Sequence, residues 1–249
     1  MIKILHLFPD LMNLYGEYAN VEILKLCLQA KGYSVSIERK FFKNNINFLD
    51  SDFVYMGSGL ESNQKCALSI LKRYKAEIFN SINSDKVFLF TGNSFEIFSE
   101  KIVSRETNYS GLGIFDFNVQ EKFSERITSD VIFKSKELSS TVVGFINKCS
   151  EVFGIKNNFF EVIKGMGDNK KHKKEGIIFK NFFGTSLIGP LLVKNPDLLE
   201  KISNLLIKTS SAKSNDAEDD KNTSKVLFEK IKIYLKKSFE LTLKKLSKT

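Results

Sequence analysis

Apolar and polar positions follow two alternating rhythms in the first half of the chain. Segments typical of strands, short and either apolar or strictly alternating, are residues 2–8, 33–38, 52–57 and 86–92. Residues 17–32 and 63–82 instead carry apolar side chains at helical spacing, and Gly32 ends the first of these two segments. The order strand, helix, strand predicts an α/β protein. We expect a mostly parallel central sheet with helices on both faces.

The second half of the chain has a different pattern. Four short segments rich in β-branched and aromatic residues are separated by turns with Gly or Asn, and they are residues 112–120, 126–134, 141–147 and 157–164. We expect them to form additional, partly antiparallel strands. Residues 194–208 then predict a helix, with Asn195 as its cap and Pro196 in its first turn.

The C-terminal part differs in composition from the rest. Residues 209–224 are polar and of low complexity, so we expect a linker between a domain at residues 1–208 and a last helix at residues 225–249. That helix is basic and amphipathic, with an apolar stripe of Phe228, Ile231, Leu235 and Phe239. We favour packing of the stripe on the domain or a neighbouring subunit. Contact with an acidic membrane remains the alternative, and this helix is the only segment that suggests one.

Composition limits the chemistry that the chain can perform. With 42% hydrophobic and 27% charged residues, its 249 residues suit a soluble globular protein with a substantial core. Three scattered Cys and two His, His6 and His172, indicate neither a disulfide framework nor a metal site, and no cofactor is expected. The net charge of +9 comes mainly from dispersed Lys, which we interpret as solvated surface and not as a nucleic-acid site.

We also expect a cytoplasmic location. The sequence begins MIKILHLFPDL, without the basic segment and long apolar run of a secretory signal. No apolar run approaches the roughly 20 residues that a membrane-spanning helix needs.

Candidate chemistry lies where the predicted parallel strands end, because ligands of such sheets bind beyond the carboxyl ends of the strands. The stretch FLFTGNSFEIF at residues 88–98 has the outline of a sharp strand-to-helix turn, which in many enzymes presents a nucleophile. The loop GSGLES after residue 56 is a second such segment, with Gly57, Ser58 and Gly59 as backbone donors for an anion. Gly-containing loops alone are equally explained as simple turns.

Several blocks in order resemble one family. LFPDLMNLYGEYAN at the start and GPLLVKNP at residues 189–196 resemble the glutaminase subunit of lipid II isoglutaminyl synthase. That subunit belongs to the cobyric-acid-synthase-like branch of the triad-type (class I) glutamine amidotransferases. The resemblance covers about residues 1–208. It implies the class I amidotransferase fold and a Mur-ligase-like partner that amidates the D-glutamate carboxyl of lipid II.

The chain departs from this family at both reactive positions. The family's nucleophile block reads vCGGYQLLG, and TGNSFEIFS aligned with it places Gly92 at the nucleophilic Cys. Sliding by one residue places Thr91 there but spoils the other matches. The family's general base lies in GTYLHGPLL, whereas this chain has GTSLIGPLL, with Ile188 at the base. Thiol attack on glutamine needs both groups.

The resemblance implies a glutamine pocket that is only partly inherited. Gly57, Ser58 and Gly59 remain as oxyanion-hole candidates, and Arg126 is a candidate partner for a carboxylate, although a surface role is equally compatible. Glu96 replaces a family Gln and adds a negative charge, while Ile146 replaces a family Glu.

Three hypotheses follow. The favoured one is a catalytically degenerate amidotransferase-like subunit, in a heterodimer with a Mur-ligase-like enzyme of cell-wall precursor metabolism. The second is an active glutamine amidotransferase that uses other residues. The third is a module whose cleft senses glutamine or a related small ligand.

Overall fold

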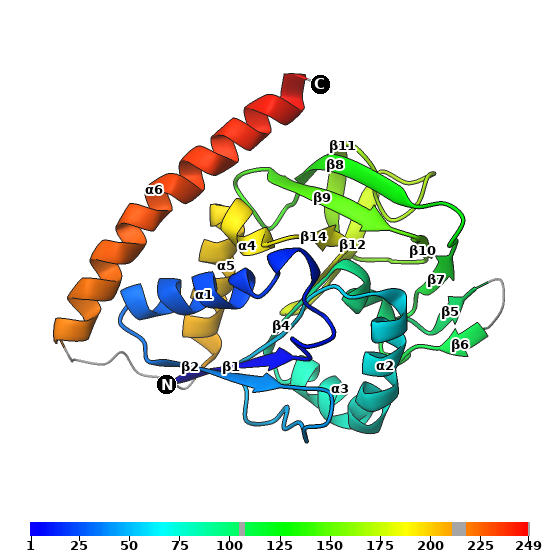
Figure 1. Cartoon of the computed structure of the whole chain (residues 1–249), viewed down its shortest axis with the longest axis horizontal. Helices are drawn as coiled ribbons and strands as arrows, with labels where there is room; N and C mark the ends of the chain where they lie inside the picture. Colours follow the sequence, from blue (N-terminus) through cyan, green and yellow to red (C-terminus); the bar gives the residue numbers. More distant parts are fainter. Residues whose placement is uncertain (105–107, 211–217, 249) are drawn as a thin grey trace.

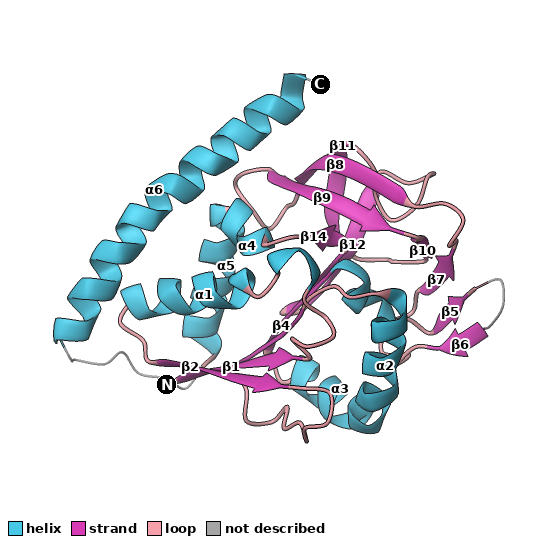
Figure 2. Ribbon diagram, in the orientation of Figure 1, coloured by secondary structure: helices cyan, strands magenta, loops and turns pink. Residues whose placement is uncertain are grey.

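The computed structural model describes residues 1–104, 108–210 and 218–248 (Figures 1 and 2). Half of its ten-stranded sheet is parallel and is built from β2 (Val35–Lys40), β1 (Ile2–Leu7), β3 (Phe53–Met56), β4 (Val87–Thr91) and β13 (Phe182–Thr185), in that spatial order. Each neighbouring pair among them is parallel. The parallel core that the sequence predicts is therefore present.

Successive residues of the central strands bury opposite faces of the sheet. In β4, Val87 and Leu89 point into one hydrophobic cluster, and Phe88 and Phe90 into the other. The first cluster is covered by α1 (Ala19–Ala30), α4 (Leu191–Lys194) and α5 (Pro196–Thr209). The second is covered by α2 (Glu61–Leu71) and α3 (Lys75–Asn83). Helices on both faces of a parallel core confirm the predicted fold class.

The second half of the chain extends the sheet with antiparallel strands, as predicted. They are β12 (Lys174–Phe179), β11 (Asn158–Lys164), β8 (Ile127–Lys134), β9 (Val142–Lys148) and β14 (Leu187–Ile188). A separate four-stranded sheet consists of β10 (Ser150–Phe153), β7 (Asn118–Glu121), β5 (Lys101–Val103) and β6 (Asn108–Ser110). The predicted strand at residues 112–120 contributes only its end, to this smaller sheet.

Two predicted helices differ in detail. The single helix expected over residues 63–82 is divided by a 3₁₀ turn, η2 (Lys72–Tyr74), into α2 and α3. The helical pattern after β4 forms a short 3₁₀ helix, η3 (Gly92–Phe98), in which six of seven residues are buried. Such a tight helix suits a segment held between the sheet and its neighbours.

The last helix, α6 (Glu218–Lys248), begins seven residues before the predicted start at residue 225. Residues 218–224 are thus helical and not part of a linker, whereas residues 211–217 of the predicted linker lie outside the described residues. The predicted stripe packs on the domain: Phe228 and Leu235 are buried, and Ile231 packs beside them. Within the described ranges, no helix combines the length and apolar character needed to cross a membrane.

The parallel strands bring three loops to one edge of the sheet. The loop after β1, with the 3₁₀ turn η1 (Leu14–Gly16), lies beside the loop that follows β3 and the start of η3 after β4. Leu14 N–H donates to the Ser58 carbonyl over 3.0 Å, which ties the first two loops together. The candidate chemistry identified from the sequence therefore gathers at this carboxyl edge.

Candidate functional site

The turn between β4 and η3 requires a glycine. Gly92 has φ +62°, in the left-handed region that side chains with a Cβ enter only at a cost. β4 ends at Thr91 and the 3₁₀ helix starts directly at Gly92, so the chain reverses within one residue. This is the geometry of a nucleophile elbow, with no side chain at its tip.

The surroundings of Gly92 leave no room for a side chain. An ideal Cβ on Gly92 would lie 2.3 Å from Ser58 Cβ and 3.0 Å from Ile188 Cγ2. Ile188 reaches this point from β14, and it is itself buried. The structure thus brings Gly92 and Ile188, the positions that the sequence analysis aligned with the family's nucleophile and base, next to each other. An aliphatic group faces bare backbone there.

A buried carboxyl that the sequence analysis did not single out lies directly beside this point. Glu17 is fully buried, and its Oε2 accepts hydrogen bonds from Ser58 N–H at 2.5 Å and from Thr91 Oγ1 at 2.9 Å. Burial raises the pKa of Glu17 to about 8, although the bonds from Ser58 and Thr91 oppose the shift. Its only sequence signal is its place directly after the LYG of the opening block.

Side chains of the protein itself occupy two of the three amides proposed for an oxyanion hole. Ser58 N–H donates to Glu17, and Gly59 N–H donates to Asn93 Oδ1 over 3.1 Å. A Cβ on Gly57 would lie 2.5 Å from Glu17 Oε2, so the carboxyl also fills the space beside that glycine. An oxyanion hole needs free donors aimed at the reacting oxygen, and Ser58 and Gly59 do not offer them here.

A cleft opens next to the elbow, with an empty volume of about 490 Å³ that includes open solvent at its mouth. Its lining includes Ser58, Gly59, Glu96 and Arg126, four of the residues that the sequence analysis proposed for a ligand. Gly92, Ile188 and Glu17 are not among the described residues that line it. The cleft therefore borders the elbow at Ser58 and Asn93, and Gly92 itself does not line it.

Glu96 forms part of the cleft wall and is held on both carboxylate oxygens. Gln64 Nε2 donates to Oε2 over 3.0 Å, and Ser150 Oγ donates to Oε1. Burial raises the pKa of Glu96 to about 7, and the hydrogen bonds from Ser150 and Gln64 and the charge of Lys148 oppose this. The carboxyl that replaces the family Gln is thus a buried, hydrogen-bonded part of the wall.

Arg126 lies at the cleft but is already paired. Its guanidinium donates to Glu61 Oε1 over 3.0 Å and to Asn147 Oδ1 over 2.9 Å, with about half of the side chain exposed. The Cys149 thiol donates to the same Glu61 oxygen over 3.0 Å. A ligand carboxylate could bind Arg126 only by competing with Glu61.

Cys149 is the one thiol among the described residues that line the cleft, and its environment disfavours the thiolate. Burial raises its pKa, and the hydrogen bond to Glu61 and the charges of Glu61 and Glu96 raise it further. Cys27 is buried in α1, and Cys66 is exposed on α2. Glu61 accepts the hydrogen bond of the thiol, but the bond from Cys149 and the charge of Arg126 lower the pKa of Glu61 despite its burial, so this carboxylate is a weak base for a thiol whose pKa is raised.

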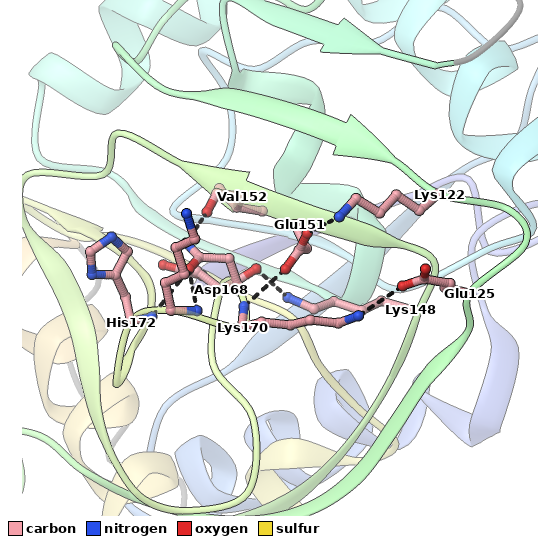
Figure 3. Close-up of polar contacts among 10 residues, drawn as sticks. Lys122, Glu125, Lys148, Glu151, Val152, Asp168, Lys170 and His172 are labelled. Atoms are coloured by element: carbon pink, nitrogen blue, oxygen red, sulfur yellow. Dashed lines mark hydrogen bonds and ion pairs between the residues drawn. The ribbon is translucent and has the colours of Figure 1, made fainter.

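Neither imidazole lines the cleft. His6 is buried on β1 against the Tyr55 ring, and burial lowers its pKa to about 4. His172 lies on an exposed loop that is bound to β10. The backbone N–H of His172 donates to Asn169 Oδ1, and the Asn169 side-chain amide donates to the Val152 carbonyl (Figure 3). No thiol and imidazole are therefore paired in this cleft.

The loop that carries His172 forms a polar wall behind the cleft. The buried Lys148 ammonium donates to the Gly167 and Asp168 carbonyls, both at 2.9 Å, while Lys122 pairs with Glu151 (Figure 3). Over the described ranges, no cluster of His, Cys, Asp and Glu is arranged to hold a metal ion.

Comparison with known proteins identifies the family of this domain. The sequence pattern of the CobB/CobQ-like glutamine amidotransferase domain matches residues 3–196, so the chain belongs to that family. It is 28% identical over 200 residues to the Lipid II isoglutaminyl synthase (glutamine-hydrolyzing) subunit GatD of Staphylococcus aureus (strain N315), covering 80% of this chain and 82% of that protein. The same subunit of Streptococcus pneumoniae (strain ATCC BAA-255 / R6) is 25% identical over 210 residues, covering 83% and 81%.

Two solved structures have a similar outline at low sequence identity. A glutamine amidotransferase (tm1158) from Thermotoga maritima has a TM-score of 0.47 at 12% identity, covering 94% of this chain and 97% of that chain. The glutaminase domain of Trypanosoma brucei CTPS with bound acivicin has a TM-score of 0.46 at 10% identity, covering 84% and 94%.

The crowding at Gly92 predicts the effect of a side chain there. Gly92→Ala adds left-handed strain of about 1–2 kcal/mol and overpacking of about 1–3 kcal/mol. Gly113 has a similar φ of +58°, but a Cβ there meets only Lys75 Nζ at 3.6 Å. Urea unfolding should therefore show a larger decrease in the free energy of unfolding for Gly92→Ala than for Gly113→Ala. Adding Ser58→Gly should recover part of the difference, and equal losses at both glycines would contradict the crowding.

The raised pKa of Glu17 predicts a pH-dependent stability. Between its ordinary pKa near 4.5 and the folded value of about 8, the folded chain holds this proton more tightly than the unfolded chain. Its contribution to stability therefore falls as pH rises through this window. The lowered pKa of His6 has the opposite effect on stability, but only up to about pH 6.5, the ordinary pKa of a histidine.

The measurement is urea unfolding of the wild type and Glu17→Gln from pH 6.5 to 8. The variant should gain stability relative to the wild type by up to about 1.4 kcal/mol per pH unit. Glu125→Gln is the control, because Glu125 is exposed and its ion pair with Lys170 lowers its pKa. A pH-independent difference for Glu17→Gln would show that Glu17 is ionised throughout.

Proposed function

We propose that this chain is a glutamine amidotransferase-like subunit that does not hydrolyse glutamine. It serves as the non-catalytic partner of a Mur-ligase-like amidating enzyme in cell-wall precursor metabolism, in the cytoplasm. One observation carries the proposal: Gly92, at the tip of the elbow, packs against Ser58 and Ile188 with no space for a side chain.

The chemistry of glutamine hydrolysis explains the weight of this observation. A nucleophile must attack the amide carbon, and a base must take its proton and return one to the leaving ammonia. Gly92 offers no nucleophile and Ile188 no titratable group. The hydroxyl of Thr91, directly before Gly92, is buried and donates to Glu17. Loss of such a pair lowers turnover by several powers of ten.

The relatives support a role as a partner. Both are named as subunits of a lipid II isoglutaminyl synthase, so each works within a larger enzyme. This chain retains the family's domain over residues 3–196, and Ser58 and Ile188 occupy the space that a side chain at position 92 would need. A heterodimer in which it stabilises the ligase-like subunit, or helps that subunit use free ammonia, accounts for both features.

An assay of glutamate release tests the proposal. The purified chain, alone and with a Mur-ligase-like subunit from the same organism, should show no glutaminase activity, whereas the ligase-like subunit should co-purify with it. A glutamine-analogue electrophile should leave Cys149 unlabelled because its pKa is raised.

The alternative of an active amidotransferase predicts the opposite result. Glutamate release that is abolished by Cys149→Ser and unaffected by Cys66→Ser would overturn the proposal. Cys66 is the matched control because it is exposed on α2 and does not line the cleft.

The cleft itself favours a second candidate, the binding of a small amino acid such as glutamine or glutamate. Arg126 and Glu61 both line it as an ion pair, and a zwitterion could bind there by replacing that pair with its own carboxylate and ammonium. If so, glutamine or glutamate should raise the melting temperature of the chain, with about 2.7 kcal/mol of stabilisation at a hundredfold excess over Kd. Arg126→Gln should abolish this shift and Arg39→Gln should not, because Arg39 pairs with Glu22 outside the cleft.

A further inference from the structure

Helix α6 has two apolar faces, of which only one is covered. Its inner face packs on the domain through Phe228, Leu235 and Leu246, which are each 5–6% exposed. In Figure 1, α6 runs as a straight rod along the outside of the molecule, beside α1, α4 and α5. The face that points away from these helices is left to solvent.

The outer face of α6 carries two rows of exposed apolar side chains at a spacing of seven residues. Leu227, Tyr234 and Leu241 form one row, with exposed fractions of 48%, 72% and 59%. Val226 and Ile233 form the other, at 56% and 68%. Seven residues are about two helical turns, or about 10.5 Å, so each row lies along one side of the rod.

A row of lysines lies between these two apolar rows. Lys230, Lys237 and Lys244 repeat at the same seven-residue spacing and are exposed. On a helical projection of 100° per residue they fall between Leu227 and Val226, and within residues 225–248 no acidic residue falls in the same sector. Residues 225–248 hold eight lysines and two glutamates, so this part of α6 carries six net positive charges.

The pattern argues against two kinds of occupant. A second copy of the chain would bring the same six positive charges against this face, and the repulsion opposes pairing. Protein interfaces are depleted in Lys and enriched in Arg, whereas residues 225–248 contain no Arg.

We propose that the outer face of α6 binds the surface of an anionic lipid bilayer. Leu227, Tyr234 and Leu241 insert at the boundary between headgroups and acyl chains, while the Lys230, Lys237 and Lys244 side chains extend to the phosphates. Tyr234 suits this depth because its ring is apolar and its hydroxyl stays in water. This inference goes beyond the proposed function and does not depend on it.

Vesicle flotation of the full chain tests the proposal. The wild type should float with vesicles of equal parts phosphatidylglycerol and phosphatidylcholine at physiological ionic strength, and not with phosphatidylcholine alone. The triple variant Leu227→Gln, Tyr234→Gln, Leu241→Gln should bind about tenfold more weakly or worse, because the inserted area is lost. Gln keeps a good helix propensity, and circular dichroism checks that α6 remains folded.

Matched controls separate insertion from general adhesion. Leu49→Gln, Phe79→Gln, Phe123→Gln removes three similarly exposed apolar groups elsewhere and should leave binding unchanged. Two triple variants compare equal losses of charge. The variant Lys230→Gln, Lys237→Gln, Lys244→Gln changes the outer face, and the variant Lys225→Gln, Lys232→Gln, Lys236→Gln changes one side of the same helix. The first should weaken binding more than the second.

The absence of Trp from the chain provides a direct readout of depth. Tyr234→Trp introduces a single Trp whose emission should shift to the blue on anionic vesicles, while Phe79→Trp should not shift. No flotation with anionic vesicles overturns the proposal, as does flotation that the apolar triple variant leaves intact. It also fails if the Lys230, Lys237, Lys244 variant loses the ligase-like subunit while the wild type ignores vesicles, because α6 would then serve a protein.

Discussion

The contact between the loop after β3 and the turn after β4 determines the character of the whole site. Because Gly92 lacks a Cβ, Ser58 can pack directly against the elbow. In this position Ser58 N–H reaches the Glu17 carboxyl, and Ile188 closes the other side. A nucleophile at position 92 and the present packing of Ser58 exclude each other. The loop after β3 can therefore lie close to the turn at Gly92 only because this turn carries no side chain.

Glu17 extends this local packing into a network that spans several elements. Thr91 donates to its carboxyl and also shares a hydrogen bond with the Tyr55 hydroxyl at 3.1 Å. Asn20 of α1 donates to that hydroxyl over 2.8 Å and accepts from Leu192 N–H of α4 over 2.7 Å. Buried polar groups stabilise a fold when they are paired, and this chain of bonds pairs Glu17 Oε2, the Thr91 and Tyr55 hydroxyls and the Asn20 amide. At the carboxyl edge of the sheet, where a catalytic site is expected, these hydrogen bonds connect α1, β3, β4 and α4.

The sequence predicted the sheet well because its signals are local. Alternation in β4 and the apolar run of β3 need no knowledge of distant contacts. The division of the helix at Lys72–Tyr74 was missed because apolar spacing continues through it. Asn195 lies at the expected start of α5, yet its side chain binds both backbone groups of Val143 on β9 instead of capping the helix. Tertiary partners of this kind leave no local signal.

In the site, too, the sequence predicted local features but not the tertiary contacts between them. The alignment of motifs singled out Gly92 and Ile188, but it could not predict that the two residues touch each other, or that Glu17 and Asn93 accept hydrogen bonds from the loop amides. Glu61 and Cys149 lie 88 positions apart and meet only across the cleft.

The two faces of α6 give the site a fixed relation to whatever the helix binds. Its inner stripe joins the hydrophobic cluster that also holds α1, α5 and the central strands. A helix anchored in this way cannot turn its outer face without exposing Phe228 and Leu235, at a cost of about 1.5–3 kcal/mol for each. A surface bound by the lysine row therefore orients the sheet, and with it the cleft at the carboxyl edge. For the non-catalytic subunit that we propose, holding a partner enzyme at a defined orientation to such a surface is a role that packing alone can perform.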